Sequence, residues 1–427
     1  MAWITIALLV GFFALAIPVA AALGLLGIVL GAVFSPMPIN RALGEVAWSA
    51  GTEFLLFAVP LYILMGEILL RSGVAMRMYG ATVQWLSWLP GGLMHANIGA
   101  CAMFAATSGS SVATAATIGT VALPERARYH YQERLFLGSV AAGGTLGILI
   151  PPSINMVVYA LLAEQSIPQL YLASFIPGIL LAALFSLTIG LACLLKPRWG
   201  GKRIETDWAA RRASLRHLLP PLGIFFVVIG SIYAGLATPT ESAALGVLAS
   251  LGLAAWNRSL TIPVLRHAFE GTLRITGMTM LIVVSAYYLN FILAAVGLTS
   301  QAVSYVQGLG LTPMQTILAV CLLYIVLGCF MDALAMMVTT APLVVPIVVA
   351  QGFDPVWFGV LMMVLSELGM ITPPFGINLF VVQSVRGRGT LNDVIAGSAP
   401  FMMTMLAMVG LLIAFPWIAL GLPNLLR

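Results

Sequence analysis

Hydroxyl groups and a glycine interrupt an otherwise apolar segment at Ser108, Gly109, Ser110 and Ser111. Such a cluster suits a sharp turn between two short helices, with a serine capping the helix that starts near Val112. The same hydroxyl and carbonyl oxygens suit a hard cation, which prefers oxygen ligands, while the N-terminus of the following helix favours an anion. The residue types allow both uses, and one does not exclude the other.

A second kind of break is a Pro-Pro pair inside an apolar segment, and the chain contains it twice. Gly147 to Asn155 reads GILIPPSIN, and Gly369 to Asn378 reads GMITPPFGIN. A proline pair cannot sit in an unbroken helix, so it frees backbone carbonyl groups from helical hydrogen bonds. The candidate cation ligands here are Ser153, Asn155, Thr372, Pro373, Gly376 and Asn378. An asparagine in a membrane helix can also serve only as a hydrogen bond between helices.

Asp332 is the most informative single charge, because an acid at membrane depth is costly unless it is paired or coordinated. It follows a predicted break that begins near Gly328, and it fits a helix N-cap and an ion or substrate ligand equally well. Glu241 fits the first turn of a helix and favours a structural role. Glu67 and Glu367 are weaker candidates for proton or ion binding.

The sequence does not predict an enzyme. Its four histidines are scattered without a Ser-His-Asp arrangement, and it has no Walker sequence Gly-x4-Gly-Lys-Ser/Thr. Its four cysteines lie in apolar stretches without metal-ligand spacing, which is typical of packing. An intramembrane lipid-modifying enzyme is therefore a distant alternative, and we expect transport that draws on an ion gradient rather than on ATP.

The composition identifies the elements that must hold these residues. Of the 427 residues, 61% are hydrophobic and 8% are charged, and the mean hydropathy is +1.06. These values predict an all-α integral membrane protein. The predicted spans are 3–33, 50–70, 134–163, 170–195, 218–236, 241–256, 275–296, 356–384 and 398–420.

The two Pro-Pro breaks belong to an internal repeat in which every matched pair is separated by the same offset along the chain. The matched pairs are Thr117 with Thr339, Pro124 with Pro346, Phe136 with Phe358, Gly147 with Gly369, and Pro151-Pro152 with Pro373-Pro374. A shift larger by a single position brings Asn155 onto Asn378. Equal spacing over this length predicts an ancient duplication.

The charges predict that the two repeats have opposite orientations. The segment after Pro124 is rich in arginine and is expected in the cytoplasm, whereas the segment after Pro346 has no basic residue and is expected outside. Equivalent loops on opposite faces define an inverted-topology repeat. We assign 1–195 to the first repeat, 196–217 to a basic cytoplasmic linker and 218–427 to the second repeat. The N-terminus is then expected inside and the C-terminus outside.

Each repeat should contain a re-entrant helical hairpin. Segments 92–124 and 313–350 are too long for one span and too interrupted for two, so each is expected to enter and leave by the same face. Irregular backbone exposed to lipid is strongly unfavourable. The hairpin tips, at 108–111 and 328–332, should therefore lie inside protein or against an aqueous cavity.

Four motifs in order carry a resemblance to a known family. They are SGSS at 108–111, GGTLGILIPPS at 143–153, ATPTE at 237–241 and GMITPPFGIN at 369–378. Together they closely resemble the large membrane subunit of tripartite ATP-independent periplasmic (TRAP) transporters, over essentially the whole chain. Phe375 departs from the family pattern, where a small aliphatic residue is expected, and it could narrow the adjacent cavity or change only the packing.

The resemblance implies an elevator-type secondary transporter of the bacterial inner membrane with sodium as the coupling ion. It places one group of sodium ligands at Ser108, Gly109, Ser110, Ser153 and Asn155, and another at Gly328, Asp332, Thr372, Pro373, Gly376 and Asn378. It also implies two partners. They are a small four-helix membrane subunit, expected as a separate chain, and a periplasmic substrate-binding protein.

Family substrates are small organic anions such as dicarboxylates, sialic acids and sugar acids. Since no arginine lies securely at membrane depth, half-helix N-termini, bound cations and hydroxyl groups would have to balance the substrate charge. The candidate substrate-binding hydroxyls are those of Ser111, Thr114 and Thr340. The alternative is a sodium or proton symporter of the same superfamily that needs no binding protein.

Overall fold

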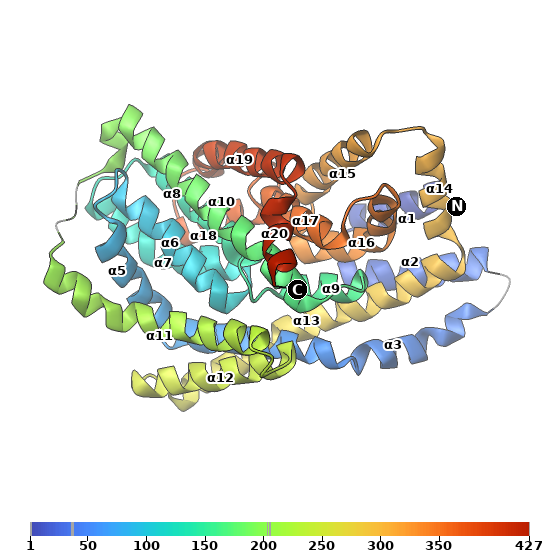
Figure 1. Cartoon of the computed structure of the whole chain (residues 1–427), viewed down its shortest axis with the longest axis horizontal. Helices are drawn as coiled ribbons and strands as arrows, with labels where there is room; N and C mark the ends of the chain where they lie inside the picture. Colours follow the sequence, from blue (N-terminus) through green and yellow to red (C-terminus); the bar gives the residue numbers. More distant parts are fainter. Residues whose placement is uncertain (1, 36–37, 203, 205, 427) are drawn as a thin grey trace.

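The computed structural model describes residues 2–35, 38–202, 204 and 206–426, and all regular structure in this part of the chain is helical (Figure 1). The repeat is visible in the helix bounds. Helix α7 (Ser111–Arg128) and helix α16 (Ala333–Ala350) are both 18 residues long, and their starts are separated by the same offset as Gly147 and Gly369. The starts of helix α8 (Glu133–Gly144) and helix α17 (Pro355–Met370) are separated by that offset too.

Both predicted hairpins are confirmed. In the first half, α6 (Gly92–Ser108) and α7 pack against each other, and in the second half α15 (Pro313–Gly328) and α16 do the same (Figure 1). Each hairpin follows a short helix, α5 (Val74–Leu86) or α14 (Leu298–Gly308). Gly73 and Gly297 precede these helices with φ values of 70° and 73°, a left-handed conformation that glycine adopts without strain.

The helices broken at Pro-Pro continue as α9 (Ile154–Leu162) and α18 (Ile377–Arg386). Helix α9 packs against α16, and α18 packs against α7 and α8, so each broken helix crosses to the hairpin of the other half. Helix α19 (Leu391–Ala414) packs closely on α8, where a Cβ atom at Gly138 or Gly397 would overlap the facing backbone. Hairpins and broken helices therefore form one interlocked layer.

A second layer lies beside this body and runs along the lower side of Figure 1. It contains α2 (Val19–Phe34), α3 (Leu43–Gly51), α4 (Ala58–Arg71), α12 (Pro239–Trp256) and α13 (Ile262–Ala295). Helix α13 packs on α2, α3 and α4, and α12 packs on α4. Among the described helices six are long and apolar enough to cross a membrane, including α10 (Ile167–Leu195), α11 (Trp208–Tyr233), α13 and α19.

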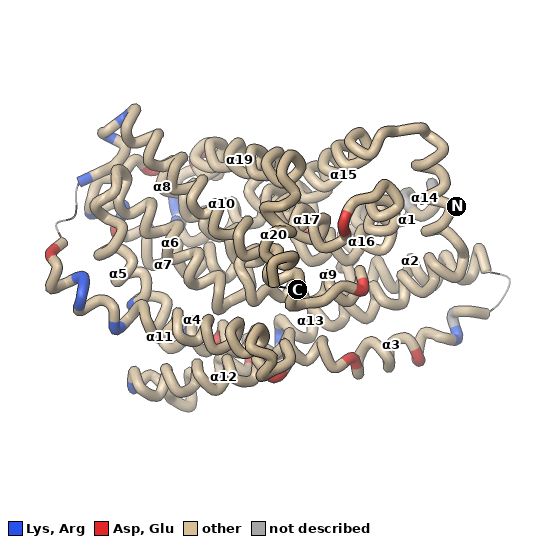
Figure 2. The backbone as a smooth tube through the Cα atoms, in the orientation of Figure 1, with Lys and Arg blue, Asp and Glu red and all other residues tan. Residues whose placement is uncertain are grey.

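The predicted single span at 3–33 is wrong. The chain instead forms two helices, α1 (Ala2–Ala14) and α2, because it turns at Ala16, which has a φ of 55°, and because Pro18 stands at the N-cap position of α2. The two helices pack against each other, and the start of α1 lies at the same end of the long axis as α14 (Figure 1). Lys and Arg gather at the opposite end, around α5, α8 and the start of α11 (Figure 2).

The linker is shorter than predicted, because α11 begins at Trp208 with Asp207 as its N-cap. A short helix at Pro197–Gly200 precedes it, and the linker docks on the turn between α7 and α8. The Lys202 amide donates to the Tyr129 carbonyl at 2.7 Å, and the Gln132 amide donates to the Trp199 carbonyl at 3.2 Å. At the C-terminal end, α20 (Trp417–Leu425) packs against α10.

Candidate functional site

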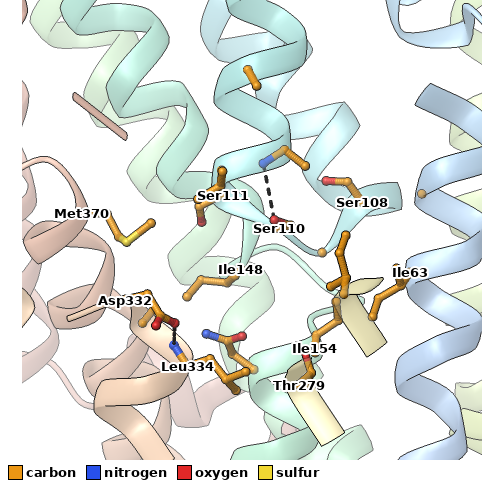
Figure 3. Close-up of a pocket in the computed structure, with 18 of the residues that line it drawn as sticks. Ile63, Ser108, Ser110, Ser111, Ile148, Ile154, Thr279, Asp332, Leu334 and Met370 are labelled. Carbon is orange, nitrogen blue, oxygen red and sulfur yellow. Dashed lines mark hydrogen bonds between the residues drawn. The ribbon is translucent and has the colours of Figure 1, made fainter. Parts of the chain in front are cut away.

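The first hairpin tip, tip 1, comprises residues 108–111. Helix α6 ends at Ser108, and Gly109 turns the chain with a φ of 61°. Ser110 then caps α7, accepting a hydrogen bond on Oγ from the Ala113 amide at 3.4 Å (Figure 3). The Thr114 hydroxyl donates to the Ser110 carbonyl at 2.7 Å and also contacts Ser108 Oγ at 3.0 Å. Tip 1 is therefore a compact group of oxygen atoms at a helix N-terminus.

The backbone of the first Pro-Pro break lies directly against tip 1. A Cβ atom at Gly147 would lie 2.6 Å from the Ser110 carbonyl carbon, so only glycine fits there. A Cβ atom at Gly109 would likewise lie 3.1 Å from the Pro152 carbonyl oxygen. Ser153, which is fully buried, caps α9. The structure thus brings the break at 147–153 to tip 1, as the sequence predicts.

The second hairpin tip, tip 2, comprises residues 328–332. Its Asp332 caps α16, because Oδ1 accepts from the Leu334 amide at 3.0 Å and from the Ala335 amide at 3.1 Å (Figure 3). A Cβ atom at Gly328 would lie 2.9 Å from the Cα atom of Gly369, where the second break begins. The rings of Phe375 and Phe330 are tilted against each other, with 5.7 Å between their centroids. Phe375 therefore packs against this tip.

The two matched asparagines do not take equivalent surroundings. Asn155 lines the central cavity described below. Asn378 Nδ2 donates to the Ala141 carbonyl of α8 at 3.4 Å, so its amide lies against the first half, although the sequence grouped it with tip 2. Its Oδ1 atom is buried and has no partner among the described residues.

A cavity of about 380 Å³ lies between the two tips (Figure 3). Tip 1, the start of α16 with Asp332, the first break and α17 form one side. Residues of α4 and α13 form the other side, including Gly66 and Thr279. Gly66 lets tip 1 approach α4, because a Cβ atom there would lie 3.0 Å from the Cα atom of Ser108. The cavity therefore lies where the hairpin layer meets the second layer.

Glu367 of α17 is the site residue that sequence reasoning underrated. It lines the cavity and is fully buried. The hydroxyl of Ser111 donates to its Oε1 atom, and Oε2 has no partner among the described residues. This contact joins a hairpin of the first half to a broken helix of the second. The available signal was an acid in the middle of an otherwise apolar predicted span.

The predicted site residues divide into two groups. Those that line the cavity are Ser108, Gly109, Ser110, Ser111, Asn155 and Asp332. Those that lie in the tips, breaks or hairpins without lining it are Ser153, Gly328, Thr372, Pro373, Gly376, Asn378, Thr114 and Thr340. The Thr340 hydroxyl bonds to Tyr324 and to the Met336 carbonyl, so it serves its own hairpin.

Residues 6–418 match the family described as tripartite ATP-independent periplasmic transporter, DctM component. The chain is 34% identical over 404 residues to the C4-dicarboxylate TRAP transporter large permease protein DctM of Pseudomonas aeruginosa, covering 94% of this chain and 93% of that relative. It is 30% identical over 372 residues to the ectoine TRAP transporter large permease protein TeaC of Halomonas elongata, covering 87% and 86%.

Two further similarities agree with these. The sialic acid TRAP transporter permease protein SiaT of Haemophilus influenzae is 30% identical over 391 residues, which is 91% of this chain and 62% of SiaT. The fold is similar to that of the Alcanivorax borkumensis YdaH transporter, with a TM-score of 0.63, 17% identity and coverage of 94% and 98%. The chain therefore belongs to the DctM component family of TRAP transporters, and it is a membrane transport protein rather than an enzyme.

Proposed function

We infer that this chain is the translocating subunit of a sodium-driven importer of small organic anions. The observation that carries this proposal is the convergence of two hairpin tips and a broken helix on one cavity. Interrupted helices at membrane depth offer helix N-termini to anions and freed carbonyl groups to cations. The relatives named for C4-dicarboxylates, sialic acid and ectoine support a small organic acid as the cargo.

Sodium is the proposed coupling ion at two places. The first is tip 1 with the adjoining break, including Ser153 and Asn155. The second is tip 2 with Thr372, Pro373 and Gly376. Asn378, whose Nδ2 atom bonds to α8, is proposed to contribute to it through its unpartnered Oδ1 atom. The close backbone contacts of Gly147 with Ser110 and of Gly328 with Gly369 support these pairings, since they hold oxygen-bearing backbone of both elements together. Two bound cations would offset the negative charge of an anion in a cavity whose lining contains no Lys, Arg or His among the described residues.

The proposed movement is of the elevator type. The hairpins and broken helices form an interlocked body, and α2, α3, α4, α12 and α13 form a separate layer. Helices α5 and α14 connect the two layers, each after a left-handed glycine that can act as a hinge. The proposed partners are a small four-helix membrane subunit and a periplasmic substrate-binding protein.

The proposed orientation places the Lys- and Arg-rich end in the cytoplasm of the bacterial cell, as the positive-inside rule requires (Figure 2). Helix α1 then starts on the periplasmic side, in place of the cytoplasmic start expected from a single span (Figure 1). Cysteines introduced by Asp354→Cys and His130→Cys test this orientation, since all four native cysteines are buried. A membrane-impermeant reagent added outside should label position 354 and not position 130. Equal labelling of both would reject the orientation.

The function is tested with proteoliposomes that contain this chain and its small subunit. With the binding protein outside and an inward sodium gradient, a labelled acid carried by that binding protein should accumulate. A membrane potential of 100 mV contributes about 2.3 kcal/mol per charge moved, so accumulation should rise with an inside-negative potential if more sodium than anion charge enters. Uptake indifferent to sodium would reject the proposal, and uptake without the binding protein would favour the alternative symporter.

A further inference from the structure

Glu367 has an acceptor oxygen that no described residue uses. Its side chain is fully buried and lines the cavity, Oε1 accepts from the Ser111 hydroxyl, and Oε2 has no partner. Buried polar atoms in folded proteins almost always have a partner, and the exceptions point to an unseen ligand or water. The position of Glu367 at the cavity wall makes a bound substrate the natural partner.

The other two acids of the cavity differ from Glu367 in this respect. Glu67 pairs with Arg71 at 2.7 Å on α4. Asp332 is occupied as the cap of α16 through two backbone amides. Of the three acids that line the cavity, Glu367 is thus the one with a fully buried and unpaired carboxylate oxygen.

We propose that Glu367 binds a hydrogen-bond donor of the substrate, a hydroxyl or an ammonium group, and so selects hydroxy or amino acids over plain carboxylic acids. This inference rests on the proposed import of a small organic acid. The carboxylate of such a substrate would lie towards the N-termini of α7 and α16 and the bound cations, while its donor group meets Oε2. A plain dicarboxylate would leave Oε2 unpaired and would add negative charge beside it.

A site built to bond a donor discriminates strongly against the analogue that lacks it, because the buried acceptor is then left unpaired. A site without such a group would treat the two analogues alike. Two matched series therefore separate the possibilities. The first is succinate, malate and aspartate, which differ by hydrogen, hydroxyl and ammonium on one carbon. The second is hexanoate and gluconate, which differ by hydroxyl groups.

The experiment measures binding to the purified complex of this chain and its small subunit, at saturating sodium, by the shift in thermal unfolding with increasing acid. We expect at least one donor-bearing acid to bind about tenfold or more tightly than its plain analogue. Glu367→Leu should abolish that preference, and Glu367→Gln should weaken it. Glu270→Gln, on the exposed face of α13 and outside the cavity, should retain the preference and is the matched control.

Sodium-dependent stabilisation without any acid reports on folding and on the cation sites in every variant. It should be unchanged in Glu367→Leu. The inference is overturned if no acid of either series binds, if plain and donor-bearing acids bind equally, or if the preference survives in Glu367→Leu. It is also overturned if Glu367→Leu changes the sodium dependence instead, because Glu367 would then be a cation ligand. Wild-type protein indifferent to sodium would contradict the proposed coupling but not the donor preference.

Discussion

Tip 1 offers hydroxyl groups where tip 2 offers a carboxylate. Ser110 and Asp332 are equivalent positions of the repeat, and each caps the second helix of its hairpin. The Ser110 cap accepts one amide at 3.4 Å, whereas the Asp332 cap accepts two at 3.0 and 3.1 Å. The two tips therefore share the same backbone arrangement but differ in charge, since the capping residue is neutral in tip 1 and acidic in tip 2.

The two halves also differ in charge next to the Pro-Pro breaks. Glu367 of the second half corresponds to Thr145 of the first, which directly follows α8 and whose hydroxyl donates to the Ala142 carbonyl of that helix. Ser111, the partner of Glu367, corresponds to Ala333. The bond between Ser111 and Glu367 therefore has no counterpart on the other side of the pseudo-symmetry. Both unshared acids, Asp332 and Glu367, come from the second half, so the two halves contribute different charges to the cavity lining.

The largest effect on transport is expected from a feature that both halves share, the glycine that starts each Pro-Pro break. Gly147→Ala and Gly369→Ala each place a Cβ atom against the backbone of the neighbouring tip. Overpacking of this kind costs about 1–3 kcal/mol, and it also displaces the tip from the break. We expect both variants to lose transport almost completely and to unfold at lower temperature. Gly190→Ala on α10 is the control, because no described atom lies within 4 Å of the added Cβ. Normal transport in either variant would contradict the close contact.

The next effect tests the difference between the tips. Asp332→Ser gives tip 2 the capping residue of tip 1, and since serine caps a helix about as well as aspartate, the loss of stability should stay below about 1 kcal/mol. The lost carboxylate should raise the sodium concentration for half-maximal uptake several-fold. Ser110→Ala, which removes a cap without removing a charge, should lower the unfolding temperature more than it changes the sodium dependence. The reverse pattern would show that the charge of tip 2 is not used for sodium.

Sequence reasoning located the hairpins and breaks because glycine and proline punctuate apolar segments. The predicted segment 313–350 became α15 and α16 with the same outer limits, and the break at 108–111 separates α6 from α7. These signals are local, since they depend on the backbone preferences of a few neighbouring residues. The same preferences explain why the linker is shorter than predicted. Hydropathy alone predicted a helix from position 218, but α11 begins at Trp208 because Asp207 caps it.

The features that sequence could not supply depend on contacts between distant residues. Ser111 and Glu367 are 256 positions apart, and nothing in either segment indicates that they meet. The contact of Asn378 with Ala141 spans 237 positions and places its amide against the first half. The prediction of a single span at 3–33 failed for another reason. Hydropathy stays high through the turn, and Pro18 is the residue that marks the boundary between α1 and α2.

A smaller effect separates the two matched asparagines. Asn155→Leu and Asn378→Leu each remove an amide oxygen and keep similar bulk, so each should raise the sodium concentration needed for half-maximal uptake. Asn378→Leu should in addition lower stability by about 1 kcal/mol, because it loses the bond to the Ala141 carbonyl. Sodium titrations of uptake, together with unfolding temperatures, measure both effects. Wild-type sodium dependence in both variants would remove the asparagines from the candidate sites.

The smallest effect concerns the ends of the broken helices. Helix α18 ends at Arg386, whose side chain is 7% exposed and donates from Nε to Glu133 at 3.1 Å and from Nη2 to Asp393 at 3.2 Å. The equivalent end of α9 has no ion pair among the described residues, since Ala163 follows it. Arg386→Gln should therefore weaken the packing of α18 without affecting α9.

The expected loss of stability is modest, because both acids keep another partner. Glu133 still pairs with Arg126 at 3.3 Å, and Asp393 still pairs with Arg134 at 3.0 Å. The two acceptor carboxylates are partly exposed, so these charged hydrogen bonds contribute little to stability, and salt screens them. The unfolding temperature of Arg386→Gln should thus fall by a few degrees at low salt and by less at high salt, while the sodium dependence of uptake stays unchanged. A loss of transport without a loss of stability would instead mean that Arg386 takes part in the movement of the hairpin layer.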